Sequence, residues 1–560
     1  MRGKQRGWQA NMHNWLSKLK TQQLSLWFLG VIWFYFALVF FQLVTQDTAG
    51  NLFLQQNNAW ADWALHFTQG SALAERSLLL ESSPILLGAP FTYPFTVNLI
   101  SALLVRAGVP FFAAFTVPSF LIVSTGITLL FVLYRHWLDT PKQAMAATVL
   151  FLCNGGVGIL SALQSGLFSV EATHLPSVGI EWISVINSMF IPQRTFGLGF
   201  LVGVGALLLL YRQWQNSESL TVRTALGIGI LLGLLPLIHM HTFVALALYL
   251  ASVAVGMIVL QYRSGSVAKK RQVLGSWGIL ATTAAVVALT LMYWAYPELE
   301  STGRISWKLG WLASTHTLNW FTFWWRNWGV VPLLAVAGAG VVSQQKKSLL
   351  PWLLGGFTIF VVANLITFQA YAWDNTKLFA WSSVAFSPLA VIWLSNLWQK
   401  KSWGKWLTIT LFSFSVAAGL YDALYTLRFS QHSFLMYSSE ELQLSNWVQE
   451  HTEPNSVWLT SDKHNHWLYN LTGRQPVMGY QGWLWSHGYE YADIAQDVLD
   501  MFKNPTHNRT TFQKYGIEYV VVGPTERDQF QANVPALKNE FVVTHETDNY
   551  LIFAAEPQTE

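Results

Sequence analysis

The chain reads LSLWFLGVIWFYFALVFFQLV from Leu24 to Val44, a continuous apolar run. As a helix, a run of about 20 residues spans the roughly 30 Å of hydrocarbon in a bilayer. Basic residues precede the run, it is too long for the core of a signal peptide, and no small-residue cleavage site follows it. We therefore predict an uncleaved first membrane span behind a basic cytoplasmic tail, residues 1–23.

Further apolar runs follow, separated by short polar loops, and charged residues make up only 11% of the chain. A typical soluble protein has about 25%. Because lipid admits only helices or closed barrels, and runs of this length are helical, we predict an α-helical polytopic membrane protein. Residues 24–430 are expected to hold about eleven transmembrane helices. The later spans are expected at 112–134, 144–163, 195–211, 225–238, 243–261, 273–295, 329–343, 350–368, 378–397 and 406–426.

The basic residues between the spans are unevenly distributed. With the N-terminus inside, the inside segments hold 18 Lys and Arg residues and the outside loops hold 7. Cytoplasmic loops carry an excess of positive charge. This split predicts a plasma (inner) membrane protein with a cytoplasmic N-terminus and a periplasmic or extracellular C-terminal domain. The seven outside residues are Arg76, Arg106, Arg194, Arg304, Lys308, Arg326 and Lys377.

The apolar segment 95–105 is short, and counting it as a span would invert every later loop. The charge distribution instead favours a re-entrant or surface-lying helix within the first outside loop. That loop, residues 45–111, is then the longest in the membrane half, and long loops in compact proteins usually carry function.

Residues 438–560 alternate strand-like and helical runs, which predicts a small extracytoplasmic α/β domain. Strands are expected at 456–460, 518–522, 540–544 and 550–554, and helices at 439–450 and 492–502. The single cysteine, Cys153, lies in an apolar run and gives no support for redox chemistry. The net charge of +4 is too small to predict nucleic-acid binding.

Once this topology is fixed, the unusual polar residues collect in the outside loops. Asp62 and His66 of the first loop are four residues apart and share one face of a helix. His239 and His241 flank the turn of the third loop. Five loops thus bring polar residues to one membrane face, which predicts a roofed site there. The other candidates on this face are Tyr93, Arg194, Trp373, Asp374, Asn375 and Lys377.

Each of these residues also has a structural interpretation. Asp62 could cap an interfacial helix, Asp374 could cap the next span, and the histidines could be solvated. Arg194 and Lys377 are expected at helix N-termini, where the helix dipole disfavours a cation, so an anionic ligand would explain both. It is the convergence of these residues that favours function.

The tail adds a second group of candidates. Residues 460–466 read TSDKHNH and contain His464 and His466, but no third ligand follows at a standard metal-site spacing. Arg474 lies between this segment and the aromatic–glycine run 479–488, GYQGWLWSHG, which contains Tyr480, Trp485 and His487. That run suits a carbohydrate-stacking loop, a loop packed on the membrane face or a tight structural turn.

One outward-facing carboxylate surrounded by cations and aromatic rings suits the transfer of a sugar linked to lipid phosphate. Asp62 would accept the proton of the attacking hydroxyl, an effect of about 10²–10⁴-fold, and His66 could orient it. Arg194 and Lys377 would bind the leaving phosphate and stabilise the charge that develops on it.

Several segments also resemble a known superfamily. They are ADWALH (61–66), SP and GAPFTYPF (83–84, 88–95), PQR (192–194), LP and HMH (235–236, 239–241), WDNTK (373–377) and GWLWSHG (482–488). They are similar to segments of bacterial polytopic proteins that resemble the GT-C glycosyltransferases. That superfamily includes protein O-mannosyltransferases, aminoarabinose transferases and oligosaccharyltransferase catalytic subunits.

The resemblance covers most of the chain and implies a polyprenyl-phosphate or polyprenyl-diphosphate sugar donor. It also implies a catalytic acid in the first outside loop, which falls on Asp62, and a divalent cation as cofactor in some members. Asn98 stands where an aspartate is expected and Ala370 where a proline is expected. Asn98 weakens the case for a second acid or a metal site in that loop.

We therefore expect a glycosyltransferase whose partners are membrane lipid, a polyprenyl-phosphate sugar donor and a glycan, lipid or protein acceptor. The alternative is a non-catalytic transporter or binding scaffold for lipid-linked glycans. Transporters often show repeats and broken helices at the bilayer midplane. Here the sequence shows no repeat, and the charged candidates lie at the ends of spans.

Overall fold

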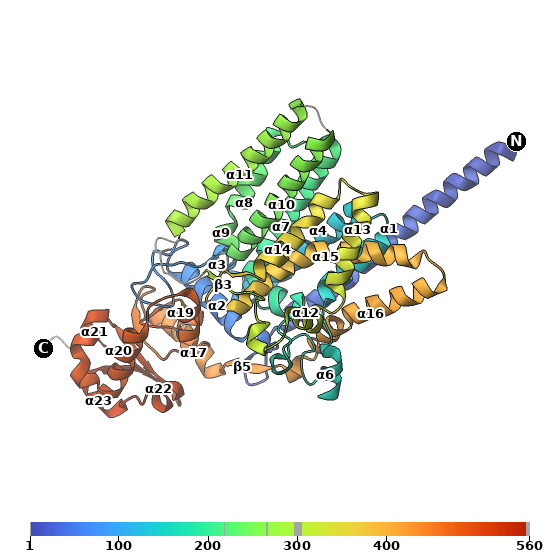
Figure 1. Cartoon of the computed structure of the whole chain (residues 1–560). Helices are drawn as coiled ribbons and strands as arrows, with labels where there is room; N and C mark the ends of the chain where they lie inside the picture. Colours follow the sequence, from blue (N-terminus) through green and yellow to red (C-terminus); the bar gives the residue numbers. More distant parts are fainter. Residues whose placement is uncertain (1, 218, 265–266, 296–304, 556–560) are drawn as a thin grey trace.

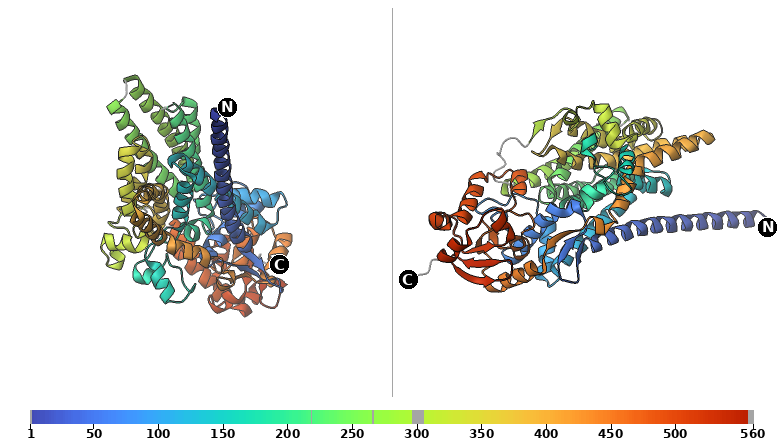
Figure 2. Two further views of the ribbon diagram at one scale, coloured as in Figure 1. Left: turned by 90° about the vertical axis from the view of Figure 1, so that its right-hand side faces the viewer. Right: turned by 90° about the horizontal axis from the view of Figure 1, so that it is seen from below.

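The computed structural model describes residues 2–217, 219–264, 267–295 and 305–555. Arg304 and the last five residues of the predicted tail domain lie outside this part of the chain. Figure 1 shows a bundle of long helices with the C-terminal residues gathered at one end. The start of α1 (Arg2–Gln42) projects from the opposite end (Figures 1 and 2).

Within the described ranges, seven helices are long and apolar enough to cross a membrane. They confirm the prediction of a multi-pass helical membrane protein. These helices are α1, α4 (Phe111–Trp137), α7 (Arg194–Ser217), α10 (Met240–Ser264), α11 (Val267–Ala295), α15 (Thr376–Trp398) and α16 (Ser402–Tyr425).

Two further predicted spans fall in bent pairs of helices. α5 (Pro141–Cys153) and α6 (Gly158–Gln164) meet at 57°, and α12 (Trp320–Trp328) and α13 (Val331–Gln345) meet at 92°. Counting each pair as one span gives nine in the described part of the chain. The predicted spans 225–238 and 350–368 contain only shorter helices, so the total of eleven stays a prediction. The shorter helices are α8 (Val222–Gly233), α9 (Leu235–Ile238) and α14 (Leu350–Ala363).

The short apolar segment of the first loop is helix α3 (Thr96–Arg106). Eleven residues of helix extend about 16 Å, which is too short to cross about 30 Å of hydrocarbon. α3 packs against α2 (Trp60–Glu75) and α4, so it belongs to the first loop.

Helix α15 forms the centre of the bundle and packs against α5, α10, α13, α14 and α16. Gly338 lets α13 approach it closely, because a Cβ at this position would lie 2.0 Å from the carbonyl oxygen of Leu389. Small residues serve this purpose between membrane helices, where close backbone approach replaces the hydrophobic effect as the source of packing energy. Leu389 lies in the middle of α15, so this contact holds α15, whose first turn carries Lys377, close to α13.

The first outside loop is tied to the chain segment that precedes the tail. β1 (Val44–Gln46), β2 (Leu52–Leu54) and β5 (Phe434–Tyr437) form an antiparallel sheet in the order β1-β2-β5. The short helix η1 (Asn57–Ala59) follows β2 and leads directly into α2. Two distant parts of the chain thus fix the start of α2, the helix that carries Asp62.

The tail contains a five-stranded sheet with strand order β7-β6-β8-β10-β9. β6 runs parallel to β7 and β8, whereas β10 runs antiparallel to β8 and β9. Four of these strands overlap the segments expected from the sequence. The strands are β6 (Val457–Leu459), β7 (Gln475–Pro476), β8 (Tyr519–Val522), β9 (Val542–Glu546) and β10 (Leu551–Ala554).

Helices flank the tail sheet, and the first of them begins at a capping box formed by Ser438 and Glu441. The helices are α17 (Ser439–His451), α18 (Trp467–Thr472), α19 (Gln481–His487), α20 (Ala492–Lys503), α21 (Arg509–Tyr515), α22 (Pro524–Asp528) and α23 (Val534–Glu540).

Helix α18 of the tail docks directly on α2. The hydroxyl of Thr68 donates to Oδ1 of Asn470 at 2.7 Å, and the hydroxyl of Ser71 donates to the carbonyl oxygen of Tyr469 at 3.2 Å. Gly473 ends α18 with φ +70°, and a Cβ there would lie 2.7 Å from the Ser71 carbonyl oxygen. α2 is therefore packed between the membrane helices and the tail.

Candidate functional site

Asp62 lies in the first turn of α2, where a carboxylate interacts favourably with the helix dipole. Its side chain is half-buried and interacts electrostatically with Lys377 and Asp374. Burial raises the pKa of the Asp62 carboxyl, Lys377 lowers it and Asp374 raises it, which together place it at about 6. A carboxyl group with this pKa can exchange a proton near neutral pH, as a general base must.

Lys377 and Asp374 form an ion pair of 3.1 Å between Nζ and Oδ1, and both side chains are largely buried. Asp374 belongs to the short helix η5 (Ala372–Asn375), directly before α15, and its Oδ2 accepts a hydrogen bond from the amide of Gln369. The cation at the start of α15 thus has a carboxylate partner within the protein.

His239 and His241 flank the start of α10, and both are buried. The backbone N–H of Thr242 donates to Nδ1 of His239 at 3.2 Å, so a neutral ring carries its proton on Nε2. Nε2 of His241 has no hydrogen-bond partner among the described residues. Both rings interact electrostatically with Lys377, which places them in the same cluster.

Tyr93 completes this cluster from the first loop. Its phenol interacts with Asp62 and Asp374 and hydrogen bonds to Thr195. Burial, followed by the charge of Asp62, raises the pKa of Tyr93, so the phenol stays protonated. The predicted convergence of the loops is therefore present for Asp62, Tyr93, His239, His241, Asp374 and Lys377.

The aromatic run of the tail lies against these loops. The ring of His487 is 4.9 Å from that of Tyr93, and the ring of Trp485 is 6.2 Å from that of Tyr371. The hydroxyl of Tyr489 donates to the carbonyl oxygen of Pro90 at 2.8 Å. Trp485 keeps 51% of its surface exposed. α19 thus packs on the outside loops next to the polar cluster.

The whole chain resembles two solved membrane proteins. The first is the oligosaccharyltransferase of Archaeoglobus fulgidus with a tethered acceptor peptide, at a TM-score of 0.50 and 12% identity, covering 94% of this chain and 74% of that one. The second is ArnT from Cupriavidus metallidurans bound to undecaprenyl phosphate, at a TM-score of 0.51 and 12% identity, covering 96% and 98%. The fold is that of the GT-C glycosyltransferases.

At this level of identity the likeness establishes the GT-C fold alone. No protein-family model matches the sequence, and no curated protein sequence matches it either. The roles of individual residues in this GT-C fold therefore rest on their own contacts.

Those contacts do not support the phosphate-binding role predicted for Arg194. Arg194 is 2% exposed, and its guanidinium donates to Ser119 Oγ at 2.9 Å, to Asn98 Oδ1 at 2.8 Å and to Ser101 Oγ at 2.6 Å. The Phe115 ring lies 4.6 Å from the guanidinium carbon. Arg194 therefore holds α3 and α4 against the start of α7. Neutral partners surround it because Asn98 replaces the expected aspartate.

His66 lies one turn beyond Asp62 but is buried, and its electrostatic neighbour is Arg194. Burial, followed by the nearby guanidinium, lowers the pKa of His66 well below its usual range, so the ring is neutral. The predicted role of orienting Asp62 stays a prediction.

Asn375 also has a structural role instead of the predicted substrate contact. Its amide donates to the carbonyl oxygens of Ala363 at 2.8 Å and Ile366 at 2.7 Å, at the C-terminal end of α14. Trp373 donates its indole N–H to the carbonyl oxygen of Glu181 at 2.9 Å, while its ring packs against that of Tyr371. Trp373 thus borders the cluster and joins two outside loops.

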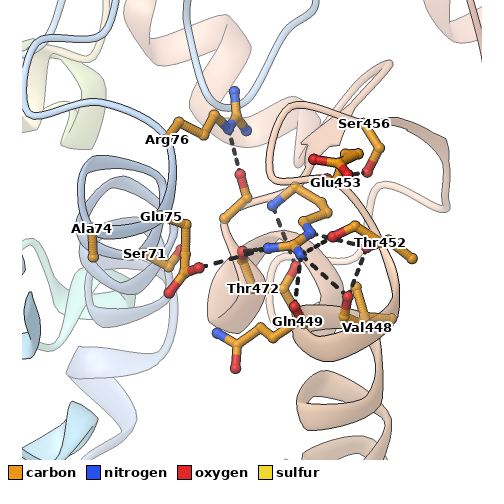
Figure 3. A network of polar contacts seen from close by, with 12 residues as sticks. Ser71, Ala74, Glu75, Arg76, Val448, Gln449, Thr452, Glu453, Ser456 and Thr472 are labelled. Atoms are coloured by element: carbon orange, nitrogen blue, oxygen red, sulfur yellow. Dashed lines mark hydrogen bonds and ion pairs between the residues drawn. The ribbon is translucent and has the colours of Figure 1, made fainter.

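Two tail residues predicted to bind substrate are likewise structural. His466 contacts Glu526 at 3.1 Å, and its Nδ1 accepts the N–H of Leu468 at the start of α18. Arg474 is buried and donates to the carbonyl oxygens of Val448, Gln449 and Thr452 at the end of α17. Its Nη1 lies 3.8 Å from Glu75 of α2. Figure 3 shows Glu75, the last residue of α2, across from Gln449, Val448 and Thr452, with Arg76 above them.

The prediction from sequence missed Glu181 and His316, which come from the second and fourth outside loops. Oε1 of Glu181 lies 2.6 Å from Nε2 of His316, and Glu181 interacts electrostatically with Tyr371. Each residue is a single ionisable group in a long loop, so no spacing pattern marks it. The resemblance implied a divalent cation in some members of the superfamily. In the described segments, no three His, Cys, Asp or Glu side chains are grouped so that they could hold a metal ion.

Proposed function

We propose that the chain is a GT-C-type glycosyltransferase that moves a sugar from a polyprenyl-phosphate-linked donor to a glycan, lipid or protein acceptor at the outer membrane face. The observation that carries this proposal is the position of Asp62. Its half-buried carboxyl, with a pKa of about 6, lies in a cluster with Lys377 and two histidines from other loops.

In this reaction the acceptor hydroxyl forms a bond to the anomeric carbon of the donor sugar. The bond from that carbon to the phosphate oxygen breaks, and polyprenyl phosphate leaves with the electron pair. Asp62 takes the hydroxyl proton, which contributes about 10²–10⁴-fold to the rate. The raised pKa of Asp62 supports this role, because a base of ordinary carboxylate pKa would hold the proton too weakly.

Lys377, His239 and His241 are the groups proposed to bind the donor phosphate. An ammonium group and neutral imidazole N–H groups can donate to phosphate oxygens, and a buried site strengthens these bonds. Charge grows on the phosphate as the sugar departs, so donors fixed in advance stabilise the transition state more than the ground state. The unpartnered Nε2 of His241 supports this assignment.

A hydrophobic cavity of about 230 Å³ is proposed to take the first isoprenoid units of the lipid. It is lined by residues of α8, α9, α10 and α11, among them Leu235 and Phe243, which flank His239 and His241 in the sequence. A lipid whose phosphate contacts the histidines would therefore enter an apolar channel. Other lining residues are Leu246, Ala247, Trp277 and Ala284.

The proposal is tested with the purified full chain in nanodiscs and polyprenyl phosphates carrying radiolabelled sugars. Asp62→Asn is expected to reduce transfer by about 10²-fold or more. Asp493→Asn removes an exposed carboxylate from the first turn of α20 and should transfer sugar as the wild type does. An Asp62→Asn enzyme as active as the wild type would show that the assigned base is wrong. Donor binding by a wild-type chain that never transfers sugar would instead favour a binding scaffold.

A further inference from the structure

A second aromatic group lies where α2 meets the tail. Trp60 opens α2, and 41% of its surface is exposed. The ring of His464 contacts it edge-on at 4.5 Å, and the ring of Tyr480 lies at 6.0 Å. His464 and Tyr480 also contact each other at 5.8 Å. Three rings thus hold one another while the indole keeps a large exposed surface.

The segment 460–466 that carries His464 is fixed through its backbone. Ser461 N–H donates to Glu526 at 3.0 Å, and the carbonyl oxygen of His464 accepts from the Asn470 amide at 3.0 Å. The hydroxyl of Tyr469 donates to the carbonyl oxygen of Lys463. None of these bonds uses the imidazole, and His464 Nε2 has no hydrogen-bond partner in the described part of the chain.

A polar pair stands beside these rings. The amide of Gln481 donates to Oδ2 of Asp462 at 2.8 Å, and both side chains are half-buried. Gln481 follows Tyr480 directly, and Asp462 precedes His464 by two residues. A carboxylate has about four lone-pair sites, so Asp462 can accept further hydrogen bonds while it holds Gln481. Burial raises the pKa of Asp462 and lowers that of His464 to about 4, so the imidazole is neutral.

We propose that Trp60, Asp462 and Gln481 bind a sugar unit of a carbohydrate acceptor. A pyranose ring has C–H faces that pack on an indole, and hydroxyl groups at its edge that donate to a carboxylate and an amide oxygen. Aromatic side chains supply contact area, while a few fixed polar groups set orientation. A lipid chain would leave the Asp462–Gln481 pair covered by apolar groups, which is unfavourable.

The location links this sugar site to the reaction. Trp60 precedes Asp62 by two residues in the same helical turn, so the sugar site lies within one turn of the proposed base, on a different face of α2. Its assignment to the acceptor rests on the proposed function, whereas carbohydrate binding itself does not. The two can therefore fail separately.

The test is saturation-transfer NMR with the full chain in nanodiscs and cellotriose as the probe. The equatorial hydroxyls of this glucan leave flat C–H faces, which the proposed site recognises regardless of sugar identity. The wild type is expected to transfer saturation to cellotriose. Trp60→Ala should bind at least tenfold more weakly, Asp462→Asn should also weaken binding, and Trp60→Tyr should restore part of it. Trp403→Ala removes an exposed indole of α16 and should bind as the wild type.

Absence of transfer to cellotriose, or a Trp60→Ala variant that binds like the wild type, would overturn the proposal. Quenching of Trp60 by brominated lipids would also overturn it, by placing the indole in the membrane. Asp62→Asn should still bind cellotriose. If that variant binds the probe and also transfers sugar normally, the proposed function fails while the sugar site stands.

Discussion

At the scale of single residues, burial first, and then two neighbours of opposite charge, set the pKa of Asp62 at about 6. Of these neighbours, Lys377 lowers the pKa of the carboxyl and Asp374 raises it. A general base acts in its deprotonated form, so transfer should rise as the pH passes upward through about 6. Lys377→Gln should move this rise to higher pH, and Asp374→Asn should move it to lower pH.

The measurement is the pH dependence of kcat/KM, which reports the free enzyme. Both variants will also change the rate at the plateau, because each disturbs the ion pair, so only the midpoint is compared. Midpoints that move in the same direction, or that stay at the wild-type value, would contradict the assignment of Asp62 as the titrating base.

The convergence of Asp62, Lys377 and His241 could be predicted because topology alone puts their loops on one membrane face. The partners of Arg194 could not. Asn98, Ser101 and Ser119 lie on other helices, and nothing in the sequence shows that their oxygens meet one guanidinium. A cation at a helix N-terminus indicates that some acceptor is present, and it does not distinguish a ligand from neutral protein groups.

At the scale of elements, the packing of α18 on α2 depends on Gly473. Gly473 and Gly516 both have positive φ, +70° and +60°, so alanine is strained at either, by about 1 kcal/mol. Only at Gly473 would the new Cβ collide, 2.7 Å from the Ser71 carbonyl oxygen. Gly473→Ala should therefore destabilise the chain more than Gly516→Ala, and should loosen α18.

Thermal unfolding compares the two glycine variants, and hydrogen exchange of α18 amides locates the effect. Equal losses of stability with unchanged exchange in α18 would show that the docking tolerates the extra carbon. A loss of sugar transfer in Gly473→Ala alone would show that α2 needs the tail to hold Asp62.

The cavity between α10 and α11 offers a second element-scale test. Ala247 lines it, whereas Val255 on the same helix is 61% exposed on the outer surface. Ala247→Phe should fill the cavity and raise KM for the polyprenyl donor several-fold, while Val255→Phe should leave KM unchanged. If KM for the donor rises equally in both variants, or in neither, the cavity does not bind the donor.

The element positions followed from hydropathy, but the bends did not. α5 and α6 form one apolar run broken at Gly155-Gly156, where a Cβ on Gly156 would lie 1.9 Å from the carbonyl oxygen of Arg326. The bend thus results from a contact with α12, more than 160 residues later in the chain. Hydropathy indicates which residues are removed from water, and it does not show where two helices distant in the sequence come into contact.

At the scale of the whole molecule, the predicted orientation can be tested with cysteine labelling. Cys153 is buried and is the single cysteine, so background labelling is low. Asp493→Cys in α20 should react with a membrane-impermeant maleimide in intact cells. Lys347→Cys, between α13 and α14, should react only after permeabilisation. The reverse pattern would invert the topology and place the Asp62 cluster on the cytoplasmic side.

In the proposed reaction, the ion pair between Lys377 and Asp374 would exchange partners. Asp374 neutralises the buried ammonium from within the protein, which avoids the cost of an isolated buried charge. The donor phosphate would compete with Asp374 for this ammonium, and the released carboxylate would repel both Asp62 and the phosphate. Asp374 would thereby act as an internal competitor that rebinds Lys377 and helps to release the lipid phosphate after the sugar has been transferred.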